Sequence, residues 1–275
     1  MIVDFHLHSN CSDGLLSPEE LVKESLKNNC SIIALTDHDI VNDYSYMEEN
    51  YNLPIISGIE FNTSINKLHL LGYGIKKIDE LNKKLYDLRK YNENVCIEVI
   101  LKLQAAGYDI SVEKVIDFLK NSNLEYKILD KRKLVKYLIY KGYVNNTHAA
   151  YQNLIGQQQR FYVPNKKMSP EEAINCIIEC GGVAVLAHPN TINLDAADLE
   201  KEIKLLKDNG LTGVEVFNGK AKLNYGLILD LANKYDLIQT FGSDFHNPEI
   251  DKIGIFIEND EQVEKFCQKI KKKIK

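Results

Sequence analysis

Val3-Asp4-Phe5-His6-Leu7-His8, at the start of the chain, alternates apolar and polar residues. This period of two is typical of a half-buried β-strand, in which successive side chains point to opposite faces. We therefore expect His6 and His8 to project together from one face. Two imidazoles side by side at a strand end suit a divalent transition metal, and Asp13 comes within reach if the chain turns at Asp13-Gly14. Taken by itself, the stretch fits an ordinary strand with two polar residues equally well.

The composition is that of a globular protein with a substantial core. The chain has 275 residues, of which 44% are hydrophobic, enough for one large α/β domain or two ordinary ones. A net charge of −5 argues against a broad basic surface for duplex DNA. We find neither a run of about 18 apolar residues, as a membrane span requires, nor a signal-peptide pattern. We expect a cytoplasmic protein with no membrane partner, and we assign no oligomeric state.

The six cysteines are scattered and are expected to be reduced thiols, as in other cytosolic chains of this length. They are Cys11, Cys30, Cys96, Cys176, Cys180 and Cys267. Cys176 and Cys180 have helical i, i+4 spacing, so a metal-binding pair is an alternative, although no partner cysteine or histidine lies close by in the sequence.

Strand and helix patterns alternate over most of the chain. Ser17-Pro18-Glu19-Glu20 and Ser169-Pro170-Glu171-Glu172 each combine a capping serine, a proline and early glutamates, which predicts a helix start. After the first strand, apolar runs predict strands at 31–35, 54–58, 68–73, 182–187, 213–217, 237–241 and 253–257. Strands that alternate with helices indicate βαβ units, and therefore a parallel sheet or barrel.

The segment from about Lys76 to Pro164 has a different character. It is charged and shows helical periodicity, with predicted helices at 81–103, 112–119 and 133–141 and with Gly107 and Gly142 as stops. We therefore predict a barrel formed by residues 1–75 and 165–275, with an inserted helical lid or substrate subdomain at 76–164.

Histidines and carboxylates recur where the apolar runs end. These residues are His6, His8, Asp37, His38, Glu60, His188, Asp244 and His246, with His69 in the strand beside them. The carboxyl-terminal rim of a parallel α/β barrel is where such sites are built. Imidazole and carboxylate together suit Zn, Mn or Fe, and this set suffices for two or three ions if one carboxylate bridges. Clustered divalent ions favour phosphoester hydrolysis without a serine or cysteine nucleophile.

Six motifs in order resemble those of the PHP (polymerase and histidinol phosphatase) family. They are His6-Leu7-His8, Thr36-Asp37-His38-Asp39, Gly58-Ile59-Glu60, His69-Leu70-Leu71-Gly72-Tyr73, Ala187-His188-Pro189 and Gly242-Ser243-Asp244-Phe245-His246. The resemblance implies a distorted (β/α)7 barrel of α/β class with three divalent ions, Mn, Fe or Zn. It implies one ion held by His6, His8, Glu60 and Asp244, a second by Glu60, His69 and His188, and a third by Asp13, His38 and His246. It also implies that a metal-bridging hydroxide attacks the phosphorus.

Within that family, the helical insert resembles the group of nucleoside 3′,5′-bisphosphate phosphatases and 5′-to-3′ exoribonucleases. Members of this group usually carry an Arg-x-His motif in the insert, which contacts substrate phosphate. Alignment on Lys141-Gly142 places Lys131, Arg132 and Lys133 there. We expect these three residues to bind substrate; the alternative is a solvated helix face. A further departure is Asn247, where the family often has glycine.

The expected activity is a metal-dependent phosphoesterase that acts on a small phosphorylated nucleotide or a short RNA 5′ end. Asp37 and His38 are the expected catalytic residues, with Asp37 orienting an imidazole and His38 also serving as a ligand. His148, the one histidine outside the strand-end pattern, is expected on the surface of the insert. The alternatives are a histidinol-phosphatase-like enzyme, a non-catalytic binding module and a C–N hydrolase, although the strands lack the bridging lysine usual in the last class.

Overall fold

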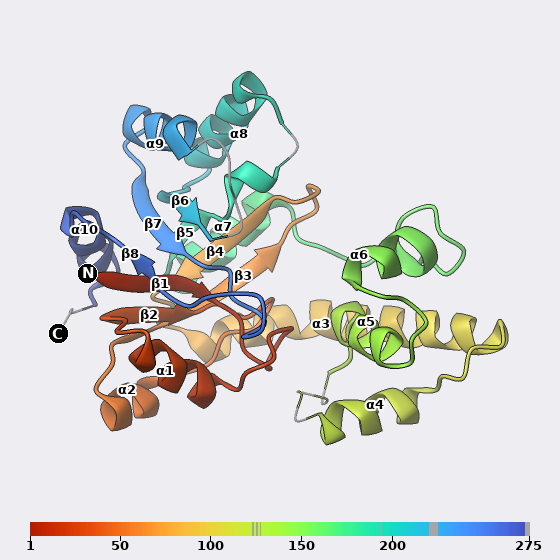
Figure 1. Cartoon of the computed structure of the whole chain (residues 1–275). Helices are drawn as coiled ribbons and strands as arrows, with labels where there is room; N and C mark the ends of the chain where they lie inside the picture. Colours follow the sequence, from red (N-terminus) through yellow and green to blue (C-terminus); the bar gives the residue numbers. More distant parts are fainter. Residues whose placement is uncertain (123, 125, 127, 193, 220–224, 273–275) are drawn as a thin grey trace. The chain divides into compact units, whose positions relative to one another are not determined.

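Figure 1 shows a computed structural model of the protein, which describes residues 1–122, 124, 126, 128–192, 194–219 and 225–272. The strands are β1 (Ile2–Leu7), β2 (Ile32–Leu35), β3 (Ile55–Asn62), β4 (His69–Tyr73), β5 (Val183–Leu186), β6 (Gly213–Asn218), β7 (Ile238–Gly242) and β8 (Ile255–Phe256). The α-helices are α1 (Pro18–Lys27), α2 (Ser45–Tyr51), α3 (Ile78–Ala105), α4 (Val112–Asn121), α5 (Lys131–Tyr140), α6 (Thr147–Ala150), α7 (Pro170–Glu179), α8 (Ala196–Asp208), α9 (Tyr225–Lys234) and α10 (Glu261–Ile270). A π-helical turn (Tyr151–Ile155) follows α6, and a 3-10 turn (Pro189–Thr191) follows β5.

The described strands form one sheet in the order β7-β6-β5-β4-β3-β2-β1-β8. Parallel pairing joins β1 to β2, β2 to β3, β5 to β6 and β6 to β7. The sheet curls until the chain just after β7 meets β1. There the His8 amide donates to the Phe245 carbonyl at 3.0 Å, and the Phe245 amide donates to the His6 carbonyl at 3.3 Å. The barrel is thus nearly closed, and the predicted α/β barrel is confirmed.

Gly242 allows the end of β7 to approach β1. A Cβ atom at this position would lie 2.3 Å from His6 Cβ and 2.7 Å from Glu215 Oε1. Such distances are far below van der Waals contact, so a larger residue would push the two strands apart. The seam of the barrel therefore depends on a residue without a side chain, directly beside the first predicted metal ligand.

The strand β4 runs against both of its neighbours, which distorts the parallel barrel. It pairs antiparallel with β3, in a register that places His69 opposite Asn62, and antiparallel with β5. The short connection between β3 and β4 favours this hairpin, because a parallel crossover needs a dozen or more residues. The amino-terminal end of β4 therefore lies at the rim where the parallel strands have their carboxyl ends. His69, the first residue of β4, reaches that rim for this reason.

The helix starts predicted at the two Ser-Pro-Glu-Glu stretches are confirmed. Ser17 accepts a hydrogen bond from the Glu20 amide and Glu20 caps the Ser17 amide in return, before α1. Ser169 and Glu172 form the same reciprocal box before α7. Each box satisfies two backbone donors that a helix start would otherwise leave unpaired.

The chain divides into two compact units, residues 1–83 with 167–275 (unit 1) and residues 84–166 (unit 2). Unit 1 contains the barrel, and one of its cores packs Leu7, Ile33 and Phe245 under α1 and α2. Unit 2 has a separate core, which includes Val99, Leu134 and Phe161. Each unit therefore has its own hydrophobic interior.

None of the helices in the described part of the chain is long and apolar enough to cross a membrane. None of the six cysteines, all of which lie in the described part of the chain, forms a disulfide, and five of them are buried. Cys176 and Cys180 lie in and at the end of α7 and belong to none of the potential metal-binding groups found among the described residues.

Candidate metal centre

The nine residues predicted as metal ligands all lie in unit 1, where the structure brings them together in three groups. The first group is His6, His8, Glu60 and Asp244, the second is Glu60, His69 and His188, and the third is His8, Asp13, His38 and His246. In each group, one nitrogen or oxygen atom from every residue lies within 4.8 Å of the others, close enough to share an ion. The groups coincide with the ligand sets implied by the family resemblance, except that His8 also joins the third.

The first group is formed where β1, β3 and the segment after β7 meet. His6 Nε2 and His8 Nε2 are 3.1 Å apart. Glu60 Oε2 lies 3.3 Å from His6 Nε2 and 3.1 Å from His8 Nε2, and Asp244 Oδ1 lies 3.6 and 3.3 Å from the same two atoms. All but Asp244 are fully buried side chains, so the four potential ligands converge in a space shielded from water.

Glu60 is shared by the first two groups. Its Oε2 faces the first group, whereas its Oε1 lies 2.9 Å from His69 Nδ1 and 2.8 Å from His188 Nε2. The structure places Glu60 inside β3 rather than just after it, because β3 continues to Asn62. One carboxylate with an oxygen toward each group is the arrangement that two bridged ions require.

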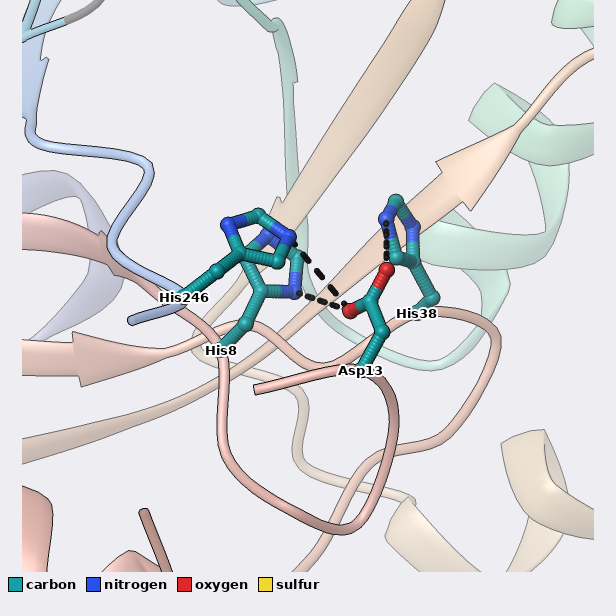
Figure 2. A group of neighbouring side chains, drawn as sticks. All are labelled: His8, Asp13, His38 and His246. Carbon is teal, nitrogen blue, oxygen red and sulfur yellow. Dashed lines mark ion pairs between the residues drawn. The ribbon is translucent and has the colours of Figure 1, made fainter. Parts of the chain in front are cut away.

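Figure 2 shows the third group, in which Asp13 lies between three imidazoles. Asp13 Oδ1 is 3.6 Å from His8 Nδ1 and 3.4 Å from His246 Nε2, and Asp13 Oδ2 is 3.7 Å from His38 Nε2. His8 thus presents its two ring nitrogens to two different groups. It forms the link between the first and third groups, as Glu60 does between the first and second.

The backbone is in the left-handed region at three positions around this rim: Asp39 at φ 56°, His188 at φ 27° and Asp244 at φ 55°. Non-glycine residues in this region cost roughly 1–3 kcal/mol each, and such strain concentrates at functional sites. His188 and Asp244 each come two residues after a strand, β5 and β7, and Asp39 follows β2 after a short segment. The strain turns the chain sharply there and directs the side chains of His188 and Asp244 inward.

The carboxylates and imidazoles of these groups shift one another's pKa values even without a bound ion. Burial by itself lowers the pKa of His8, but hydrogen bonds to Asp244 and Glu60 outweigh burial and raise that pKa to about 9. Burial also opposes protonation of His6, yet Glu215, Glu60 and Asp244 raise its pKa well above the usual value. Burial raises the pKa of Asp244, but the neighbouring histidines hold it well below its usual range. The carboxylates therefore attract positive charge to this rim.

The donor set fits borderline transition metals. Imidazole nitrogens with a few carboxylate oxygens are typical ligands of Zn, Mn and Fe, whereas Ca and Mg prefer sites built from oxygen. The three groups, the shared carboxylate and the shared histidine make the rim suitable for several divalent ions close together. Such clusters bind and polarise the oxygens of a phosphate.

Asp37 is placed differently from expectation. Its buried carboxylate accepts hydrogen bonds from the Ser9 amide at 2.8 Å, Ser9 Oγ at 2.6 Å and Ser12 Oγ at 2.7 Å, with Tyr44 Oη at 3.4 Å. These contacts hold the turn after β1, which carries Asp13, rather than an imidazole ring. His38, predicted as both ligand and catalytic residue, lies in the third group, 3.2 Å from Glu60 Oε2.

Two acidic residues behind the ligands, Glu215 and Asp4, were not among the predicted site residues. Glu215 in β6 lies 3.0 Å from His6 Nδ1 and accepts a hydrogen bond from the His188 amide at 2.7 Å. Asp4 accepts hydrogen bonds from the amides of His6, Ser243 and Gly254 at 3.2, 3.0 and 2.9 Å. A single acid in an apolar, buried strand was the available signal for Glu215, because such a charge needs partners.

The predicted substrate-binding residues lie in unit 2, in the first turn of α5. Lys131 and Lys133 are buried, so the exposed-face alternative is wrong for these two. Lys131 Nζ donates to the Val163 carbonyl, and Lys133 Nζ donates to the Ile128 carbonyl at 2.6 Å. Arg132 is half-buried, 3.8 Å from Asp130. Their role toward substrate stays a prediction.

The fold and the rim define the chain as an α/β barrel protein with a candidate multinuclear metal centre. The family model described as the PHP domain matches residues 4–182. The chain therefore belongs to the PHP domain family, as its motifs indicated.

Three curated relatives are similar over most of their length. A 5′-3′ exoribonuclease from Haemophilus influenzae is 29% identical and covers 89% of this chain and 90% of its own. A 3′,5′-nucleoside bisphosphate phosphatase from Chromobacterium violaceum is 26% identical, with coverage of 90% and 87%. A phosphoribosyl 1,2-cyclic phosphate 1,2-diphosphodiesterase from Eggerthella lenta is 28% identical, with coverage of 90% and 94%.

A solved structure from Bifidobacterium adolescentis, assigned as a metal-dependent phosphoesterase, superimposes with a TM-score of 0.83 and 21% identity. The likeness covers 97% of this chain and 96% of the other. It supports the fold over nearly the whole chain.

Proposed function

We propose that this protein is a metal-dependent phosphoesterase that hydrolyses a small phosphorylated nucleotide or the 5′ end of a short RNA. The observation that carries the proposal is the sharing of Glu60 and His8 among three ligand groups. Shared ligands place the potential ion positions close together, so several positive charges could act on one phosphate group.

The residues of the rim would have different roles in the reaction. The first and second groups would hold ions bridged by Glu60, and the third would hold another. Divalent ions in these positions would neutralise phosphate oxygens and supply a nucleophilic hydroxide near neutral pH. Asp37 holds the turn that carries Asp13, so its contribution is to keep the third group assembled. His38 lies near Asp13 and Glu60, so it would hold an ion of the third group beside the phosphate.

The nucleotide substrate is supported by two relatives whose names specify nucleoside bisphosphates and RNA. The third relative is named for a cyclic phosphodiester of ribose, at similar identity. All three substrates are phosphate esters of a ribose unit. A histidinol-phosphatase-like activity on a non-nucleotide ester is the alternative. Within the proposal, unit 2 serves as the substrate subdomain, with Lys131, Arg132 and Lys133 selecting the phosphate.

The deciding experiment is a product assay by chromatography with protein reconstituted with Mn²⁺. The substrates are adenosine 3′,5′-bisphosphate, AMP, a short 5′-phosphorylated RNA, phosphoribosyl 1,2-cyclic phosphate, histidinol phosphate and an aryl phosphate. The His6→Ala, His8→Ala double variant should lose activity. The matched control is His148→Ala, which changes an exposed histidine in unit 2 and should retain it.

Hydrolysis of the bisphosphate or the RNA, lost only in the double variant, is the expected result. Turnover of histidinol phosphate alone would replace the nucleotide proposal by the alternative. Turnover that is equal in the double variant and the wild type would refute the proposed metal centre.

A further inference from the structure

Glu215 is a buried acid that none of the three ligand groups uses. It lies in β6 between Val214 and Val216, and its side chain is 1% exposed. A carboxylate in an apolar interior costs several kcal/mol unless donors surround it, so its partners show what it does.

In the described part of the chain, three polar groups at the metal rim lie within hydrogen-bond distance of Glu215. Oε1 lies 3.0 Å from His6 Nδ1. Oε2 accepts from the His188 amide at 2.7 Å and from Asn218 Nδ2 at 3.1 Å. His6 belongs to the first group and His188 to the second, so one side chain contacts a member of each.

We propose that Glu215 is a positioning residue that sets the ligand nitrogen of His6 and the backbone turn of His188 together. The inference rests on the proposed metal centre. A carboxylate beside Nδ1 requires the proton on that nitrogen, which leaves the lone pair on Nε2. Nε2 is the nitrogen that faces Glu60 and Asp244, at 3.3 and 3.6 Å.

The second oxygen of Glu215 acts on the backbone of His188. This residue has φ 27°, a conformation that a side chain makes costly. The hydrogen bond from its amide to Glu215 stabilises that turn, and the turn directs His188 Nε2 toward Glu60, 2.8 Å away. The two oxygens of Glu215 thus position one residue of the first ligand group and one residue of the second.

Only a carboxylate can satisfy all three donors, which makes glutamine a sharp test. In Glu215→Gln, the amide oxygen can accept from His188 and Asn218, but the amide NH2 then faces His6 Nδ1. His6 would have to accept there and carry its proton on Nε2, which blocks metal binding. If the amide turns over, its NH2 meets the two donors of His188 and Asn218 instead.

The third group provides an internal comparison. Its members are His8, Asp13, His38 and His246, whereas the hydrogen bonds of Glu215 go to His6, His188 and Asn218. The loss of Glu215 should therefore weaken the first two groups and spare the third. A merely structural role in the core would lower stability without that selectivity.

The experiment uses the full chain loaded with Zn²⁺, which is diamagnetic. Zinc per chain is measured by equilibrium dialysis over a range of free zinc, for the wild type, for Glu215→Gln and for Glu202→Gln. Glu202 is a half-buried glutamate on α8, so it controls for the substitution itself. We expect zinc affinity of the first two groups to fall by about 10- to 100-fold in Glu215→Gln, with the third unchanged.

A second measurement does not depend on the variant folding. In the zinc-loaded wild type with ¹⁵N-labelled histidine, His6 should show a protonated Nδ1 and a metal-bound Nε2. Coordination through Nδ1, or unchanged zinc affinity in Glu215→Gln, would overturn the role of Glu215. A wild type that binds no zinc or manganese would instead refute the metal centre, so the two failures are distinguishable.

Discussion

Replacement of Asp37 by alanine should release the turn that carries Asp13. Three short hydrogen bonds end on this carboxylate, from the Ser9 amide, Ser9 Oγ and Ser12 Oγ, at 2.6 to 2.8 Å. Ser12 Oγ also lies 3.2 Å from Asp13 Oδ1, so the network reaches the third group. Its loss should affect both stability and metal binding.

The magnitude follows from the number and kind of these bonds. Hydrogen bonds to a charged group contribute about 1.5–3 kcal/mol each. The sum is an upper bound, because the released turn is half-exposed and some donors will reach water. We expect Asp37→Ala to lose about 3–4 kcal/mol of unfolding free energy. For a large domain, that lowers the thermal midpoint by roughly 6–16 °C.

The assay is thermal unfolding of the metal-free protein by circular dichroism, together with zinc per chain by dialysis. Asp43→Ala is the matched control, because Asp43 is exposed and accepts one hydrogen bond, from the Ser45 amide. Asp37→Ala should lose zinc from the third group, and Asp43→Ala should not. A loss below about 1 kcal/mol with full zinc binding would refute the reasoning. If Asp37 acted in the chemistry instead, Asp37→Asn would keep stability and zinc but lose turnover.

Three other perturbations have definite outcomes. Gly242→Ala should open the seam between β1 and β7 and lower both the thermal midpoint and zinc binding, whereas Gly226→Ala, with nothing within 4 Å of its added Cβ, should be neutral or slightly stabilising. Lys133→Met should raise KM, as the proposed phosphate role requires, and should cost about 1–3 kcal/mol in urea unfolding, because the buried hydrogen bond from Lys133 to the Ile128 carbonyl is lost; exposed Lys120→Met should do neither, and an unchanged KM in Lys133→Met would contradict the phosphate role. In metal-free protein, the pKa of His8 is raised from 6.5 to about 9, so protonated His8 should stabilise the fold by about 3 kcal/mol below pH 6.5. This contribution should be lost as the pH rises through 9. Urea titrations in which His8→Gln shows the same fall in stability would contradict this expectation.

The sequence predicted the barrel because its local patterns agree with the fold. The alternation around His6 and His8, the two capped helix starts and the polar residues after apolar runs each depend on near neighbours. The direction of β4 depends instead on the length of a connection. Residues 63–68 are too few for a parallel crossover, and that signal was available but not used.

Local sequence patterns could not predict which residues, distant in the sequence, become hydrogen-bond partners. Asp37 was predicted to orient an imidazole, but its contacts with Ser9 and Ser12 arise only when the turn after β1 packs against the end of β2. The burial of Lys131 likewise depends on the distant Val163 carbonyl, whereas Lys133 uses the nearby Ile128 carbonyl. A sequence shows that a charge is present, whereas its partner is a property of the packed chain.

The hydrogen bonds that join Phe245 to His6 and His8 also bear on when the ligand groups can assemble during folding. The first group combines His6 from the first strand with Asp244 from the segment after the seventh, so its halves are far apart along the chain. Contacts of such long range close large loops and are slow to form. A folding intermediate with an open seam would retain Glu60, His69 and His188 as neighbours but lack the first group. Metal uptake by the first group would then depend on the last step of barrel assembly, and the bound ion would stabilise the closed seam.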